Sequence, residues 1–360
     1  MKTVLLAPTP PPYGGIASWT QRMLKAQLKN GWELSVVDEK MIGKRNVFGG
    51  KKESRRNLVD EIKRCHRIWS GLKRELKDEQ VKIVHSCIPS ATLSMIREYV
   101  CACITKRRGR KFIIHFRCTV PNTTKSRLGK FLLKKLCKKS DFIITLNTQT
   151  NDYLDNITDT PYELIPNFIS EDEIADDYKI QDEIKTVLYV GGVVKTKGAY
   201  DFISVAEMFP NIQFRMVGRV DTAIEEYTKS KGLKNTVFTG PKDKAGVKEE
   251  LKNADIFMFL TYFGGEGFSN SLCEAMAAGL PCIVTDWAAN KDMIGEDGGC
   301  VVPIKDTEAA ASAIERMKGK QMRMKCSSTN RKKVINSYIE KIVVDKYINI
   351  YERLNEEGTS

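Results

Sequence analysis

The chain has 360 residues, of which 42% are hydrophobic and 29% are charged, and its formal net charge at pH 7 is +13. These fractions are typical of a soluble globular protein, and the length is sufficient for two domains of ordinary size. No apolar run approaches the length of a bilayer span and no secretory signal is visible, so we expect a cytoplasmic protein, soluble or peripheral on the inner face of the cell membrane. Ten scattered cysteines without a CxxC pair, and only three histidines, argue against a zinc site.

In the first half of the chain, short apolar runs alternate with helical patterns. The runs are continuous rather than alternating, which is typical of strands buried on both faces of a parallel sheet. The predicted strands are Thr3–Ala7, Glu33–Asp38, Lys82–Ser86, Phe112–Arg117 and Phe142–Leu146. The predicted helices are Ile16–Lys29, Arg55–Lys77, Ala91–Lys106, Lys125–Cys137 and Thr148–Leu154.

A second series of the same kind begins after the segment Pro166–Ser170. Its predicted strands are Thr186–Val190, Gln213–Val217, Thr236–Thr239, Ile256–Leu260, Cys282–Thr285 and Gly299–Val302. Two such series predict an α/β protein with two doubly wound, Rossmann-like domains, at residues 1–168 and 169–331. The remaining segment, 332–360, contains a helical pattern over Lys332–Leu354.

The most informative stretch is FGGEGFSNSLCEAMAAGLPCIVTDWAAN, residues 263–290. A glycine-rich loop carries Glu266, and a helix predicted over Ser271–Ala278, capped by Ser269 or Asn270, carries Glu274. The free amides at such a helix start bind phosphate. Two carboxylates beside a phosphate site repel the phosphate, so they indicate a ligand that also offers hydroxyl groups. Phosphate together with a polyol suggests a nucleotide sugar.

Seven residues separate the two glutamates, and the second of them begins the segment EAMAAGLP. This pattern resembles that of the retaining glycosyltransferases of family 4, which have the GT-B fold. Three other segments resemble the same family. They are PPPYGGIASWTQRMLKAQLKNGWELSVVD near the N-terminus, LIPNFIS between the two series, and VLYVGGVVKTKGAYDFI at the start of the second. The resemblance therefore spans most of residues 1–303. It implies two domains facing each other across a cleft, with the last helix crossing back to the first domain.

The resemblance also implies roles for individual residues. It implies that Lys197 contacts the donor diphosphate and that Glu274 binds the ribose. It also implies that Glu266 accepts hydrogen bonds from the donor sugar and that His115 touches the sugar. His85 is the less favoured alternative to His115, and His66 is predicted to lie at the surface. The predicted catalytic residues are Glu266, His115 and Lys197. The predicted donor-binding residues are Gly14, Gly15, Lys197, Gly218, Arg219, Glu266, Gly267, Phe268, Ser269, Asn270 and Glu274.

One position departs from the family pattern. The family has an arginine five residues before the lysine, where this chain has Gly192, so Lys195 or Arg219 is the candidate to replace that charge. The resemblance implies retention of anomeric configuration. A double displacement would need Glu266 as its nucleophile, but the resemblance favours a hydrogen-bonding role for this residue. We therefore expect a front-face reaction, in which the leaving phosphate oxygen takes the acceptor's proton and no protein base is needed. No metal-binding D-x-D follows a strand, so we expect no metal or other cofactor.

Positive charge is concentrated in the first half of the chain. Residues 1–168 hold 32 Lys and Arg against 15 Asp and Glu, whereas the remainder holds 26 against 30. Basic clusters occur at Lys51–Arg56, Lys106–Lys111 and Lys125–Lys139. The common explanation of the last is a surface helix, and the functional alternatives are an anionic membrane or a phosphorylated acceptor. Nucleic acid ranks last, because no nucleic-acid-binding motif accompanies the charge.

The sequence thus predicts a glycosyltransferase that moves a sugar from a nucleotide sugar to a glycan or polyprenyl-diphosphate-linked acceptor, with bacterial surface polysaccharide as the default setting. Alternatives are a nucleotide-sugar 2-epimerase of the same fold, a non-catalytic sugar-nucleotide-binding protein and, least favoured, an RNA-binding protein.

Overall fold

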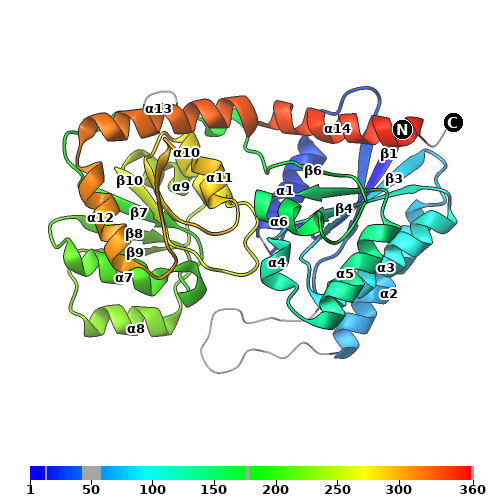
Figure 1. Cartoon of the computed structure of the whole chain (residues 1–360), viewed down its shortest axis with the longest axis horizontal. Helices are drawn as coiled ribbons and strands as arrows, with labels where there is room; N and C mark the ends of the chain where they lie inside the picture. Colours follow the sequence, from blue (N-terminus) through cyan, green and yellow to red (C-terminus); the bar gives the residue numbers. More distant parts are fainter. Residues whose placement is uncertain (13, 43–57, 176–177, 358–360) are drawn as a thin grey trace.

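The computed structural model describes residues 1–12, 14–42, 58–175 and 178–357, and it contains two six-stranded sheets. Every strand pairing in both sheets is parallel. The strand orders are β2-β1-β3-β4-β5-β6 and β12-β11-β10-β7-β8-β9. Figure 1 shows the two sheets side by side with helices around each of them. The predicted α/β class with two doubly wound sheets is confirmed.

The first sheet is built from the first 164 residues. Its strands are β1 (Lys2–Ala7), β2 (Glu33–Asp38), β3 (Val81–Ile88), β4 (Lys111–Phe116), β5 (Phe142–Thr145) and β6 (Tyr162–Leu164). The helices between them are α1 (Gly15–Lys25), α2 (Leu58–Glu75), α3 (Thr92–Arg107), α4 (Val120–Thr123), α5 (Arg127–Lys139) and α6 (Thr148–Leu154).

The second sheet follows the short 3-10 helix η1 (Glu171–Glu173). Its strands are β7 (Thr186–Val190), β8 (Gln213–Val217), β9 (Thr236–Gly240), β10 (Ile256–Phe259), β11 (Cys282–Thr285) and β12 (Gly299–Val302). Its helical elements are η2 (Lys195–Lys197), α7 (Ala199–Met208), α8 (Thr222–Ser230), α9 (Lys244–Lys252), α10 (Asn270–Ala277), α11 (Asn290–Ile294), α12 (Thr307–Met317) and α13 (Lys320–Ser337).

The last helix, α14 (Glu340–Glu356), packs on the first sheet although it follows the second in sequence. Its Tyr347 and Tyr351 belong to one apolar cluster with α1 and the inner strands, while α2, α3 and α5 contribute to the cluster on the opposite face. Figure 1 shows α13 and α14 lying end to end along both halves. One face of the first sheet is therefore covered by α1 and α14, from opposite ends of the chain, and the other face by α2, α3 and α5.

The structure corrects two sequence predictions. The single helix predicted over Lys332–Leu354 is interrupted at Tyr338 and Ile339, where the chain pairs with the linker between the sheets: Ile169 N donates to Tyr338 O at 2.9 Å and Glu340 N to Ile169 O at 3.0 Å. The second correction is β6, which was not predicted because three residues are too few for a periodic pattern. The start predicted for α2, at Arg55, lies outside the described residues.

Candidate active site

Lys197 and Glu266, from different loops of the second half, form an ion pair. Lys197 Nζ donates to Glu266 Oε2 at 2.7 Å, and the same ammonium lies 5.4 Å from the ring centroids of Phe259 and Phe263. Gly198 sets the direction of the lysine turn, because at φ +76° a Cβ on it would meet Leu260 O at 2.2 Å. The structure therefore brings together two of the three predicted catalytic residues.

The loop that carries Glu266 is in direct contact with the first half of the chain. Thr119 donates to Glu266 O through both its backbone N and its Oγ1, each at 2.9 Å. Asn147 Nδ2 donates to Gly267 O at 3.3 Å, and a Cβ on Gly267 would lie 2.9 Å from Arg117 O. Only a glycine permits this approach. Thr119 and Asn147 were not predicted, although both follow the carboxyl ends of strands, where ligand sites of parallel sheets form.

Helix α10 begins beside this loop. Ser269 caps it by accepting a hydrogen bond from Leu272 N at 3.3 Å, and Asn270 is its first residue. Phe268 is buried against Tyr338, with ring centroids 5.2 Å apart. The positive end of the helix dipole therefore points toward the loop of Glu266, an arrangement that favours an anionic group.

Glu274, one turn into α10, faces α1 of the first half. Its Oε1 lies 3.8 Å from Arg22 Nη2, and the same Arg22 nitrogen is 3.0 Å from Glu173 Oε2. Burial, followed by the charge of Glu173, raises the pKa of Glu274 to about 7, while Arg22 and Lys244 oppose this rise. No role was predicted for Arg22, although it lies in the N-terminal segment that resembles the family, or for Glu173.

Two predicted glycine sites have different structural reasons. A Cβ on Gly218, at φ +142°, would lie 1.9 Å from Gly191 O, so the fold itself requires this glycine. Gly14 and Gly15 at the start of α1 have no atom within 4 Å of an added Cβ, and neither has a positive φ. Packing and backbone conformation in the described structure therefore do not require glycine at these two positions. The absence of side chains leaves open space in which a ligand would fit.

Gly192, which stands where the family has an arginine, lies between two adjoining turns. Gly192 O accepts a hydrogen bond from Tyr189 Oη at 2.8 Å, and Val193 N donates to Arg219 O at 2.9 Å. Lys195 and Arg219 are both exposed on these turns. Either cation therefore starts from a loop next to Gly192.

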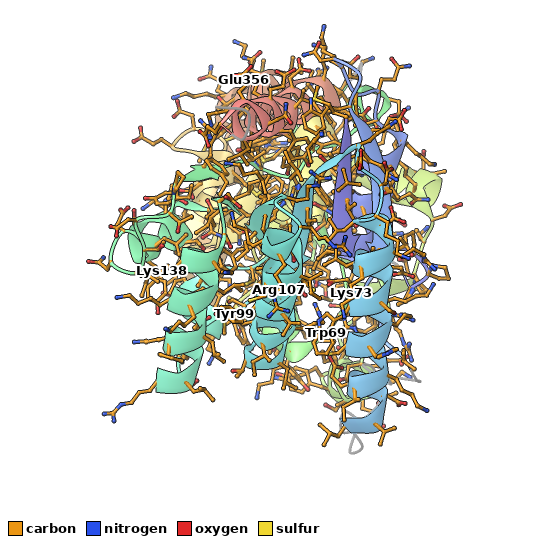
Figure 2. All side chains as sticks on the ribbon, turned by 90° about the vertical axis from the view of Figure 1, so that its right-hand side faces the viewer. Trp69, Lys73, Tyr99, Arg107, Lys138 and Glu356 are labelled. Atoms are coloured by element: carbon orange, nitrogen blue, oxygen red, sulfur yellow. The ribbon has the colours of Figure 1, made fainter. Side chains whose placement is uncertain are left out.

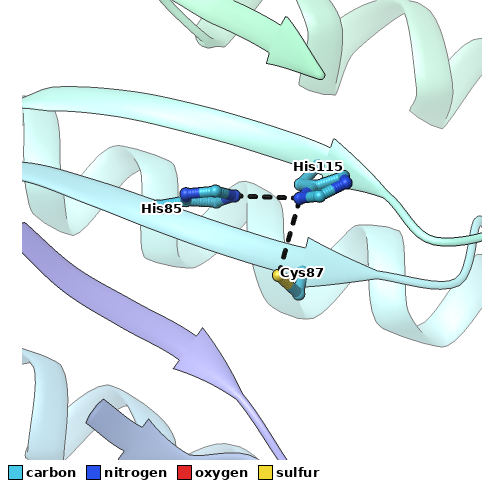
Figure 3. Close-up of side chains that lie close together, drawn as sticks. All are labelled: His85, Cys87 and His115. Atoms are coloured by element: carbon cyan, nitrogen blue, oxygen red, sulfur yellow. Dashed lines mark hydrogen bonds between the residues drawn. The ribbon is translucent and has the colours of Figure 1, made fainter. Parts of the chain in front are cut away.

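The structure does not bring His115 to the Lys197–Glu266 pair. Its side chain is fully buried, with Trp19 and Tyr347 against its ring, and it belongs to the cluster drawn in Figure 3. His85 Nε2 is 3.1 Å from His115 Nδ1, and Cys87 Sγ is 3.9 Å from the same nitrogen. Burial holds the pKa of both imidazoles low, at about 3 for His85, so both rings are neutral at physiological pH.

The guanidinium of Arg117 fixes the direction of this hydrogen-bond chain. Arg117 Nη1 lies 3.0 Å from His115 Nε2, and because a guanidinium only donates, that nitrogen carries no proton. His115 Nδ1 therefore donates to His85 Nε2, and His85 Nδ1 donates to Tyr351 Oη at 2.7 Å. A metal ion among His85, Cys87 and His115 would face the charge of Arg117, so we assign the cluster to hydrogen bonding.

The hydrogen-bond chain continues from Arg117 toward α10. Arg117 Nη2 donates to Asn167 Oδ1 at 2.6 Å, and Asn167 Nδ2 donates to Asn270 Oδ1 at 2.8 Å. Asn270 is thereby held with its amide oxygen toward the linker. No role was predicted for Arg117 or for Asn167, which lies in the LIPNFIS segment, because their partners are distant along the chain.

Comparisons with known proteins agree with this geometry. The family model described as "Glycosyltransferase Family 4" matches residues 13–173, and "Glycosyl transferases group 1" matches residues 170–333. A phosphatidyl-myo-inositol mannosyltransferase of Mycobacterium leprae is 28% identical over 185 residues, 49% of this chain and 48% of that protein. A 2-deoxystreptamine N-acetyl-D-glucosaminyltransferase of Niallia circulans is 28% identical over 176 residues, 46% and 45% of the two chains. The chain thus spans about half the length of these curated relatives.

Solved structures are similar over nearly the whole chain. Sucrose-phosphate synthase from Thermosynechococcus elongatus has a TM-score of 0.79 at 17% identity, with 98% of each chain covered. An Anabaena protein, Alr3699/HepE, solved in complex with UDP, has a TM-score of 0.73 at 12% identity, covering 98% of this chain and 100% of that one. At such identities the likeness shows the fold.

Proposed function

Because this chain belongs to the family 4 glycosyltransferases, with the GT-B fold, we propose that it moves a sugar from a nucleotide sugar to a glycan or lipid-linked acceptor with retention of anomeric configuration. The observation that carries the proposal is the Lys197–Glu266 pair beside the start of α10. A cation, a carboxylate and a helix N-terminus supply a phosphate contact and a hydroxyl contact at one place.

In the proposed complex the donor lies between the second sheet and α1. Glu274 accepts from the ribose hydroxyls, and the open space at Gly14 and Gly15 admits the diphosphate. Lys197 turns from Glu266 to the phosphate oxygens, which releases the Glu266 carboxylate to accept from the donor sugar. Asn270, held by Asn167, orients the start of α10, and Arg117 and His115 position it without touching the sugar.

Chemistry in this site centres on departure of the nucleoside diphosphate. Negative charge develops on the leaving oxygen, and Lys197, once it has turned from Glu266 to the phosphate, stabilises that charge together with the α10 N-terminus. The leaving phosphate oxygen takes the proton of the acceptor hydroxyl on the same face of the sugar, which gives retention without a protein base. Because the cation and the helix end meet the developing charge, we propose that no divalent metal is needed.

For the acceptor we propose a lipid-linked glycan at the inner face of the cell membrane, in bacterial surface polysaccharide assembly. Support comes from the basic first half and from relatives named for lipid acceptors, such as the phosphatidyl-myo-inositol mannosyltransferase of Mycobacterium leprae. No helix among the described residues is long and apolar enough to cross a membrane.

The test is release of nucleoside diphosphate from a panel of nucleotide sugars, with and without lipid extract as acceptor. One donor should be consumed, its product should keep the anomeric configuration by NMR, and activity should persist in EDTA. Inversion would contradict the proposed chemistry, and loss in EDTA reversed by a divalent ion would contradict metal independence alone. An epimerised nucleotide sugar would indicate the 2-epimerase, and binding without turnover would indicate a non-catalytic protein.

A further inference from the structure

Three helices, α2, α3 and α5, form one layer on the first sheet. Figures 1 and 2 show them side by side, and the labels of Trp69 and Lys73, and of Tyr99 and Arg107, show that α2 and α3 run in the same direction. Each of the three follows a strand of a parallel sheet, so all begin at the carboxyl edge of that sheet. The same edge carries Thr119, which contacts the Glu266 loop.

The first turns of these helices expose large apolar side chains. We call this group the apolar rim, and its members are between 43% and 69% exposed: Leu58, Val59, Ile62, Leu93, Ile96, Leu128 and Phe131. They are seven of the seventeen large apolar side chains that are exposed among the described residues. The later turns of α5 bury Leu133 and Leu136 instead, and beyond the first two turns of the three helices the only exposed large apolar side chain is Tyr99 of α3, at 36%, so most of the exposed apolar surface lies at one end of the layer. Contiguous exposed apolar surface marks an interaction site.

Positive charge borders the apolar rim, mainly on the side of α5. Five exposed basic residues lie on or directly before the same turns: Lys63, Lys125, Arg127, Lys130 and Lys134. Within the spans of α2, α3 and α5, no Asp or Glu is exposed. The Lys135 ammonium lies 5.6 Å from the Phe131 ring centroid. Apolar side chains with a basic border are the composition of surfaces that enter an anionic lipid interface, where each Lys or Arg contributes about 1 kcal/mol.

The basic clusters predicted from the sequence do not share one surface. Lys106–Lys111 spans the end of α3 and the start of β4, at the opposite edge of the sheet, where Lys106 pairs with Asp141 at 2.7 Å and Lys111 with Glu357 at 3.8 Å. The cluster Lys51–Arg56 lies outside the described residues. Only the first part of the Lys125–Lys139 cluster borders the apolar rim.

We propose that the apolar rim inserts into an anionic bilayer surface and that its basic border holds it there. The sheet edge that carries the rim then faces the lipid, which brings a lipid-linked acceptor to the edge where the Glu266 loop docks. The orientation toward an acceptor rests on the proposed function, whereas the membrane contact rests on the exposed residues alone.

Vesicle flotation with phosphatidylglycerol-containing and with pure phosphatidylcholine vesicles tests the proposal. The double variant Leu128→Ser/Phe131→Ser should lower the partition coefficient on anionic vesicles by roughly tenfold or more, because two apolar side chains lose their burial. The matched control is Met324→Ser/Ile335→Ser, two exposed apolar residues of α13, which should bind like wild type. Equal binding of both double variants and wild type would overturn the insertion.

Charge and depth are tested separately. Arg127→Gln/Lys130→Gln/Lys134→Gln should weaken binding at low salt, whereas Arg107→Gln/Arg108→Gln/Lys138→Gln, at the far ends of α3 and α5, should not. In the variant Phe131→Trp, lipids brominated in their acyl chains should quench the added fluorescence, and an Ile335→Trp control should be unaffected. Equal loss in both charge variants, or no quenching at position 131, would overturn the proposed orientation.

Nucleoside diphosphate release separates this proposal from the transferase proposal. The apolar-rim variants should release diphosphate from a soluble donor, in the absence of acceptor, at the wild-type rate, and should lose turnover only with acceptor in vesicles. If no donor is consumed by any protein while flotation gives the expected pattern, the transferase proposal fails and the membrane surface stands. If Leu128→Ser/Phe131→Ser keeps wild-type turnover with vesicle-borne acceptor, the rim has no part in acceptor presentation.

Discussion

The pH dependence of donor binding should follow the ionisation of Glu274. Its pKa is about 7, and only the ionised carboxylate accepts freely from two ribose hydroxyls. At pH 8 about ten in eleven of these groups are ionised, and at pH 6 about one in eleven, since each unit of pH changes the ratio tenfold. The KM for the nucleotide sugar should therefore rise about tenfold from pH 8 to pH 6, with a smaller change in kcat.

Neighbouring charges provide controls of opposite sign. Glu173→Gln removes a negative charge that raises the pKa of Glu274, so the rise in KM should move to lower pH. Arg22→Met removes a cation that lowers this pKa, so the rise should move to higher pH. Glu274→Gln should give a profile without the step, and Glu274→Ala a high KM at every pH. The assay is steady-state diphosphate release between pH 6 and 8. A wild-type profile that Glu274→Gln leaves unchanged would refute a donor contact at this residue.

Three further predictions follow from described contacts. Lys197→Ala should lower kcat by about two to three orders of magnitude, whereas Glu266→Gln should lower kcat with KM nearly unchanged. Wild-type kinetics in both variants would contradict a catalytic role for the Lys197–Glu266 pair. Gly198→Ala should lower the free energy of unfolding, measured in urea, by more than about 2 kcal/mol, because its Cβ would overlap Leu260 O. Gly109→Ala, at φ +67° and with no atom within 4 Å of the added Cβ, should lower it by about 1 kcal/mol. Equal losses in the two variants would show that only the backbone strain of a positive φ matters. Arg117→Met should change the ¹⁵N imidazole NMR signals of His115. It should also raise the KM for the donor, because Arg117 holds Asn167 and Asn167 holds Asn270. A KM like that of wild type would show that the effect of this hydrogen-bond chain does not extend beyond Asn167.

The sequence predicted elements whose signal is local. Strands such as Thr186–Val190 and Cys282–Thr285 were predicted with their observed bounds, because a strand buried on both faces is a continuous apolar run between loops. The break at Tyr338 was missed because it depends on pairing with Ile169, which helical periodicity does not record.

The candidate site divides in the same way. Lys197, Glu266 and the α10 cap lie in glycine-rich turns that a motif can identify, and the structure places them together. No role was predicted for Arg22, Arg117 or Asn167, although Arg22 and Asn167 lie in segments that resemble the family, because each acts on a partner from another element, such as Asn167 on Asn270. His115 lies near the carboxyl end of β4, yet Trp19 and Tyr347 enclose it, and that enclosure depends on packing of α1 and α14.

The position of α14 has a consequence for how the protein is made. Its Val343, Tyr347 and Tyr351 complete the cluster that includes Leu5 and Ile83, so the first sheet keeps one apolar face open until the last helix has left the ribosome. The second sheet, by contrast, is continuous in sequence and can close while synthesis proceeds. Domains usually fold in the order of synthesis, but here the half that is translated first is the half that is finished last. During this interval the open apolar face is prone to aggregation.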